Sequence, residues 1–66
     1  MKITANGQTF ELTAGTALPD FIRARGLAPE RVVVERNGEA LTPSETLAAV
    51  LAEGDRLEIV RIVAGG

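Results

Sequence analysis

Two Asn-Gly pairs limit the possible folds of this 66-residue chain more strongly than any other feature. Asn-Gly is a preferred sequence for the two-residue turn of a β-hairpin, because both turn residues take positive φ. Asn6-Gly7 lies within KITANGQTFEL and Asn37-Gly38 lies within RVVVERNGEAL, and each pair has apolar residues alternating with polar ones beside it. The sequence therefore predicts two antiparallel hairpins.

The segment between the hairpins changes to the periodicity of a helix. The residues at helical spacing are Leu18, Phe21, Ile22 and Arg25. Thr16 is a candidate N-cap, and Pro19 is tolerated in the first turn. Gly26 followed by Leu27 is typical of a left-handed C-terminal cap, with Pro29 as the stop. We expect this segment to form the main helix.

The segment TPSETLAAVLAEGD predicts a short second helix, followed by a turn at EGD. Thr42, Pro43 and Glu45 have the spacing of a capping box with proline at the first helical position. The apolar side of this helix is expected to consist of Leu47, Val50 and Leu51. The following segment, RLEIVRIV, is rich in β-branched residues and predicts a last strand.

This element order indicates an α+β fold, the ubiquitin-like β-grasp. Neither hairpin can bury a face alone, but one sheet with a helix across it gives them a common core. Placing the last strand between the hairpins, parallel to the first strand, keeps the most apolar strand off an edge. We expect a mixed five-stranded sheet with one main helix and a short second helical segment. The expected domain is residues 1–63, with residues 64–66 as a flexible tail.

The composition argues against several classes of function. The chain has no His and no Cys, so it can build neither a catalytic triad, nor an imidazole metal site, nor a disulfide. The net charge is −2, the arginines are dispersed, and the only aromatic residues are Phe10 and Phe21, which argues against nucleic-acid binding. No apolar stretch could span a membrane. We expect a cytoplasmic protein, monomeric when free, with no metal, no bound cofactor and no catalysis of its own.

The last residues offer one reactive group, the α-carboxylate of Gly66. Such a carboxylate is ionised at neutral pH and can attack the α-phosphate of ATP, although the ATP site would belong to another protein. Gly65 and Gly66 lack a Cβ, so the backbone could thread a narrow channel together with Ala64. The plain alternative is that Ala-Gly-Gly is a frayed end.

The last strand predicts a docking surface beside this tail. Alternation places Leu57 and Ile59 on the inner face with Val32 and Val34. The outer face would then carry Glu58, Val60, Ile62 and the neighbouring Val33. An exposed apolar patch on a small domain often marks a partner surface.

The whole chain resembles the ThiS-type sulfur carriers of thiamine biosynthesis. The likeness runs through MKITANG, VVVERNGEAL, GDRLEIVRIV and the terminal GG, although the family commonly has glycine in place of Ala64. The resemblance implies that a ThiF-type adenylyltransferase uses Mg-ATP to adenylate Gly66. Sulfur supplied through a cysteine desulfurase would convert it into a thiocarboxylate, and a ThiG-type thiazole synthase would accept that sulfur.

Several other functions remain open from the sequence. The small subunit of molybdopterin synthase shares the fold and the Gly-Gly end but is usually longer. Carriers for cysteine synthesis or tRNA thiolation are further possibilities of the same class. A β-grasp interaction module, or a protein modifier joined to lysines, is the alternative from a different class.

Overall fold

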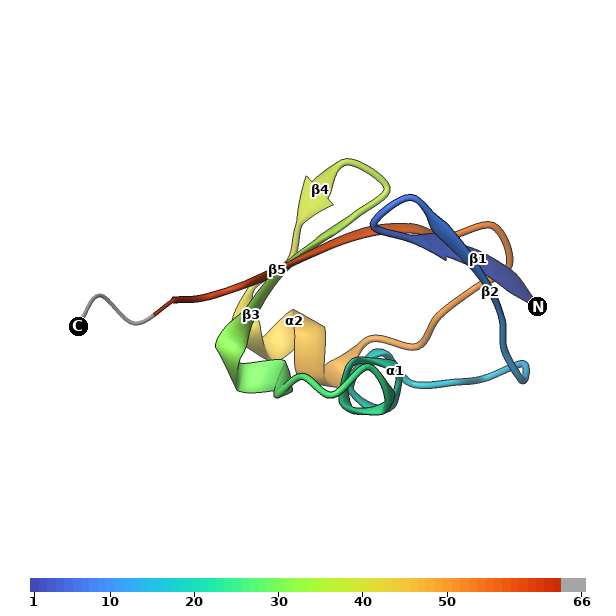
Figure 1. The fold of residues 1–66 in the computed structure, drawn as a ribbon. Helices are drawn as coiled ribbons and strands as arrows, with labels where there is room; N and C mark the ends of the chain where they lie inside the picture. The colour runs from blue at the N-terminus through green and yellow to red at the C-terminus, as the bar shows by residue number, and fades with distance from the viewer. Residues whose placement is uncertain (64–66) are drawn as a thin grey trace.

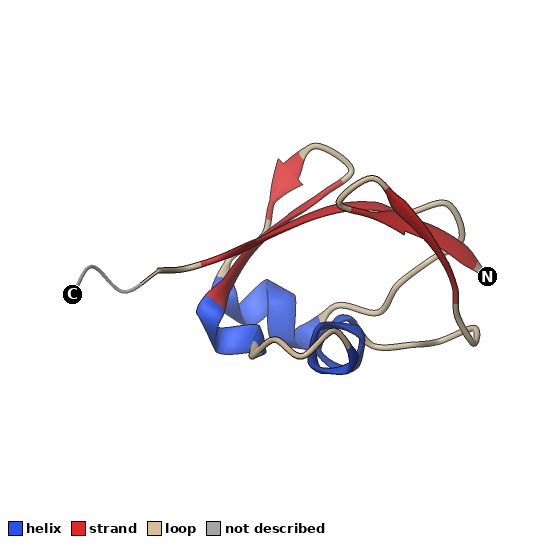
Figure 2. Cartoon of the chain, viewed as in Figure 1, coloured by secondary structure: helices blue, strands red, loops and turns tan. Residues whose placement is uncertain are grey.

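The five strands form one mixed sheet, and both α-helices cover the same face of it (Figures 1 and 2). The computed structural model describes residues 1–63. The elements are β1 (Lys2–Ala5), β2 (Gln8–Glu11), α1 (Leu18–Ala24), the 3-10 turn η1 (Pro29–Arg31), β3 (Val32–Arg36), β4 (Glu39–Ala40), α2 (Pro43–Ala48) and β5 (Arg56–Arg61). The strand order is β2-β1-β5-β3-β4, with β5 parallel to β1 and antiparallel to β3. The predicted β-grasp fold and the central position of the last strand are confirmed.

Both Asn-Gly pairs form the predicted hairpin turns. Asn6 and Gly7 have φ of 50° and 79°, and Asn37 and Gly38 have φ of 52° and 86°. Positive φ at both central residues is the geometry of the type I′ turn, whose twist matches that of the flanking strands. The first turn joins β1 to β2 and the second joins β3 to β4.

The core lies between the sheet and the two helices. Its buried apolar residues are Ile3, Ala5, Leu18, Phe21, Ile22, Val32, Val34, Leu51, Leu57 and Ile59. The strand residues among them follow the period of two, so β1, β3 and β5 each present alternate side chains to the helices. The inward phase predicted for Leu57 and Ile59, together with Val32 and Val34, is confirmed.

Helix α1 ends as predicted but begins differently. Gly26 has φ of 80°, its N–H donates to the Arg23 carbonyl, and the N–H of Leu27 donates to the Ile22 carbonyl. These two bonds define a Schellman cap. The predicted N-cap Thr16 is wrong: the N-cap is Ala17, without a side-chain bond. The Thr16 hydroxyl instead donates to the Thr13 carbonyl, 2.6 Å away, and so stabilises the preceding turn.

Helix α2 has the predicted capping box but not the predicted apolar side. The Thr42 hydroxyl accepts from the Glu45 N–H, and the Glu45 carboxylate accepts from the Thr42 N–H. The helix then stops at Ala48, so residues 49–51 are extended and follow a period of two. As a result Leu51 is buried, whereas Leu47 and Val50 are more than half exposed. The residue that α2 itself buries is Thr46, whose hydroxyl donates to the Thr42 carbonyl.

Candidate functional site

Strand β5 separates a buried face from an exposed apolar one. Val33 is 48% exposed, Val60 62% and Ile62 52%, and we call these three residues the outer-face patch. Val33 and Val60 are directly opposite each other in the β3–β5 pairing. The structure thus places the predicted residues Val33, Val60 and Ile62 together, on the face of the sheet that carries no helix.

Two carboxylates lie beside this patch. Glu58, which was predicted as a docking residue, is directly opposite Glu35 in the β3–β5 register, and both are exposed. Like charges in directly opposed positions destabilise a sheet. Glu35 was missed by sequence reasoning, although the alternation in VVVER places it on the same face as Val33. The pair is therefore a site where a basic side chain from a partner would relieve repulsion.

The middle of β5 is held by the turn asparagine of the first hairpin. The Asn6 side-chain amide donates to the Ile59 carbonyl at 3.0 Å, and its oxygen accepts from the Ile59 N–H at 2.7 Å. The side-chain amide thereby makes the two hydrogen bonds that the backbone of a neighbouring strand would make to Ile59, just beyond the end of β1. Asn37 acts similarly at the start of β5, where its oxygen accepts from the Arg56 N–H at 2.8 Å.

A buried carboxylate fixes the chain immediately before β5. Asp55 forms an ion pair with Arg36 at 2.7 Å and accepts hydrogen bonds from the Asn37 amide and the Ala52 N–H. Burial by itself would raise the pKa of the Asp55 carboxyl. The hydrogen bonds from Asn37 and Ala52, together with the Arg36 guanidinium, outweigh burial and hold that pKa below its usual value. Asp55 therefore anchors the strand as a charged group.

The far end of β5 leads out of the sheet. Arg61 pairs with Val32, and beyond it the Ile62 N–H donates to the Arg31 carbonyl at 2.8 Å. This end of the strand points away from the end of the molecule that holds the N-terminus (Figure 1). The predicted threading residues Ala64 and Gly65 and the predicted reactive residue Gly66 lie outside the described residues.

The described part of the chain offers no metal-binding cluster. Within residues 1–63 no three His, Cys, Asp or Glu side chains come together in a group that could hold a metal ion. Within the same range, no helix combines the length and the apolar character needed to cross a membrane. The geometry described above is that of an exposed apolar surface beside the last described residues of the chain.

The fold and this surface define a ubiquitin-like β-grasp protein, and sequence comparison identifies the family. The sequence model of the ThiS family matches residues 2–66. The chain belongs to the ThiS family.

Solved structures of similar proteins agree with this assignment. A crystal structure of the thiamine biosynthesis protein ThiS from Geobacter metallireducens is 29% identical, with a TM-score of 0.79 and full coverage of both chains. A solution structure of a thiamine biosynthesis protein from the same organism is 30% identical, with a TM-score of 0.76, covering 100% of this chain and 88% of that one.

Two curated relatives carry the name thiazole synthase. The protein from Magnetococcus marinus is 41% identical and that from Paramagnetospirillum magneticum is 32% identical, each over 66 residues. Both matches cover all of this chain but only 20% of the relative. The chain thus spans about a fifth of the length of these relatives.

Proposed function

We propose that this chain is a sulfur carrier protein of thiamine biosynthesis. The observation that carries the proposal is its membership of the ThiS family over residues 2–66. The structure adds a physical basis, because β5 presents an apolar and acidic surface directly before the segment that ends in Gly65-Gly66. The chain acts as the carrier and co-substrate of other enzymes rather than as an enzyme.

The proposed chemistry takes place at the α-carboxylate of Gly66. A carboxylate oxygen attacks the α-phosphate of Mg-ATP in the active site of a ThiF-type adenylyltransferase, and pyrophosphate leaves. The terminal sulfur of a persulfide, supplied through a cysteine desulfurase, then attacks the acyl carbon and releases AMP. A second thiol reduces the resulting acyl disulfide and leaves a thiocarboxylate on Gly66. The proposal requires a free carboxylate at this residue.

The proposed sulfur acceptor is a ThiG-type thiazole synthase. The two curated relatives support this partner, because proteins named thiazole synthase contain a region similar to this whole chain. Domains that occur in one polypeptide in some organisms commonly act together when they are separate chains. This chain would then deliver sulfur to the synthase.

We propose that both partners dock on the outer-face patch. Apolar contact with Val60 and Ile62 would hold the base of the tail, and the Glu35–Glu58 pair would select a basic partner surface. Ala64 and Gly65 would thread into the partner's active site through a channel with room only for backbone at Gly65. Gly65 would fit there because it has no Cβ. These residues would act together each time a partner docks.

The family match favours this function over the alternatives from the sequence. A molybdopterin synthase subunit or another sulfur carrier would use the same terminal chemistry but a different acceptor. A protein modifier would end on a lysine of its target, and an interaction module would not react at all. The first activation step separates carriers and modifiers from the interaction module.

The experiment that tests this step is ATP–pyrophosphate exchange with the purified adenylyltransferase of the same organism. Wild-type chain should support exchange, and deletion of Gly66 should abolish it because the carboxylate moves away from the α-phosphate. Gly65→Val should slow exchange while leaving the melting temperature unchanged. Exchange at the wild-type rate by the truncated chain would contradict the proposal.

A further inference from the structure

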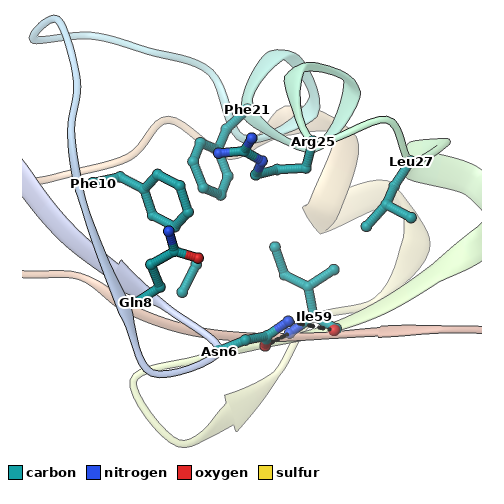
Figure 3. Close-up of a pocket in the computed structure, with 8 residues that line it drawn as sticks. Asn6, Gln8, Phe10, Phe21, Arg25, Leu27 and Ile59 are labelled. Carbon is teal, nitrogen blue, oxygen red and sulfur yellow. Dashed lines mark hydrogen bonds between the residues drawn. The ribbon is translucent and has the colours of Figure 1, made fainter.

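A cavity lies on the face of the sheet opposite the outer-face patch, between the first hairpin and the C-terminal end of α1. It has a volume of about 230 Å³. Figure 3 shows Phe10 and Gln8 on one side, Phe21 and Arg25 above, Leu27 on the other side, and Ile59 with Asn6 below. The layer between sheet and helix is therefore not filled at this end.

The cavity combines apolar walls with a cationic rim. Phe10 and Phe21 meet edge to face, with ring centroids 5.1 Å apart and planes at 79°. The Arg25 guanidinium lies 4.8 Å from the centroid of the Phe10 ring. Within residues 1–63, Arg25 forms no ion pair, although Arg23 on the same helix is paired with Asp20. Stacking on Phe10 orients the guanidinium and leaves its edge available to a carboxylate.

The cavity lies next to the part of β5 that leads to the tail. Strand β1 ends at Ala5, opposite Leu57, and Asn6 then bonds to Ile59, so β5 continues beyond the first hairpin. Ile59 lines the cavity, whereas the next residue, Val60, belongs to the outer-face patch. The cavity and the outer-face patch therefore lie on opposite faces of the same part of β5.

We infer that this cavity is a second docking point, which receives an apolar side chain with a neighbouring carboxylate from the thiazole synthase. The inference rests on the proposed function. An engineered cavity of about 150 Å³ is large enough to hold benzene, so this one can accept one aliphatic or aromatic side chain. The carboxylate would pair with Arg25 in a charge-assisted contact.

A protein segment suits this cavity better than a free small molecule. A side chain delivered by a partner already bound at the outer-face patch arrives at a high effective concentration. An open cavity in a domain of this size can then contribute to binding although it would hold a free ligand weakly. A partner bound at both the cavity and the outer-face patch would contact β5 from both faces of the sheet. These contacts would fix the direction in which residues 64–66 enter the partner.

The test compares binding of purified thiazole synthase to four variants by isothermal titration calorimetry. Gln8→Trp fills the cavity from its rim, and Arg25→Gln removes its charge. Arg25→Gln should raise Kd by about 10-fold or more, the effect expected for losing a charge-assisted hydrogen bond. Gln8→Trp should also raise Kd, because it occupies the space that the partner side chain would take. Arg23→Gln is the matched control on the same helix and should bind like the wild type. Val60→Asp tests the outer-face patch separately.

The outcomes distinguish the two proposals. Loss of affinity in Arg25→Gln with wild-type binding by Arg23→Gln supports the cavity, even if Gln8→Trp fails to fold. Wild-type affinity in both cavity variants, with loss in Val60→Asp, overturns the cavity and leaves the proposed function intact. Absence of any binding by the wild-type chain contradicts the proposed partner and the cavity inference with it.

A methyl NMR titration distinguishes a protein segment from a small ligand. The methyl signals of Ile59 and Leu27 should shift when thiazole synthase is added, and intermolecular contacts should appear to them. 3-Phenylpropionate is the free-ligand probe, since it carries a ring and a carboxylate. Shifts with 3-phenylpropionate but none with the synthase would overturn the docking inference and indicate a small-molecule site.

Discussion

At the scale of single residues, the two turn asparagines have a function that turn statistics do not reveal. Asparagine tolerates the positive φ of a type I′ turn, but glycine would tolerate it as well. The side-chain amides of Asn6 and Asn37 additionally bond to the backbone of β5, at Ile59 and Arg56 respectively. The asparagines therefore connect each hairpin to the strand that carries the candidate site.

Asp55 is the residue whose charge state should control stability in acid. Its pKa is lowered in the folded protein, so its contribution is complete above the unfolded-state pKa of about 4 and is lost as the pH falls through the lower folded value. Asp55→Asn removes the ion-pair partner of Arg36. It should lower the free energy of unfolding by about 1–3 kcal/mol near neutral pH.

Urea unfolding of wild-type and Asp55→Asn protein between neutral pH and strong acid measures this effect. The difference between the two should be constant near neutral pH and should shrink below about pH 4. Asp20→Asn is the matched control, because Asp20 forms only an exposed ion pair with Arg23 and should contribute little. A difference that did not change with pH would show that the charge of Asp55 does not stabilise the fold.

At the scale of elements, β5 carries both core residues and candidate docking residues. Ile59 is 7% exposed and packs in the core, whereas Val60 is 62% exposed and belongs to the outer-face patch. Substitutions at these two neighbours should therefore have opposite consequences.

Ile59→Ala should lower the free energy of unfolding by about 2–4 kcal/mol, because it creates a cavity in the core. Val60→Asp should cost at most about 1 kcal/mol, the range of strand propensities, and should sharply weaken binding to the adenylyltransferase or the thiazole synthase. Urea unfolding and calorimetric titration measure the two quantities. A stable Ile59→Ala and an unfolded Val60→Asp would show that the faces are assigned the wrong way round.

The elements also show where sequence reasoning succeeds and where it stops. The hairpins, the capping box at Thr42 and the faces of β5 depend on local turn chemistry and on a period of two, so the sequence predicts them. The predicted N-cap of α1 was wrong because the Thr16 hydroxyl has an equally local partner at Thr13. The predicted apolar side of α2 was wrong because the helix stops at Ala48, so that Leu51 reaches the core from an extended segment.

Some residues of the candidate site could likewise be predicted from the sequence, and others could not. Val33, Val60 and Ile62 follow from alternation, and Glu35 could have been added from the same pattern. The cavity beside Ile59 could not be predicted, because it depends on how α1 sits on the first hairpin. The roles of residues 64–66 stay predictions, since these residues lie outside the described part of the chain.

At the scale of the whole molecule, the fold places β5 at the centre of the sheet, between β1 and β3. The chain belongs to the ThiS family, and residues 1–63 fix β5 at its start, in its middle and near its end through Asp55, Asn6 and Arg31. Under the proposed function, this strand and its apolar outer face would bind a partner close to Gly66. In the proposed function, the folded domain would bind the partners and Gly66 would carry the sulfur.

The most direct test of this account is intact mass spectrometry of the chain isolated from its native host. Cells starved of thiamine, with the thiazole synthase deleted, should accumulate protein whose mass is increased by the replacement of one oxygen with sulfur. The added mass should map to Gly66 and should disappear when the adenylyltransferase is also deleted. Protein that carries no added sulfur under these conditions, or that is linked through Gly66 to lysines of other proteins, would contradict the account.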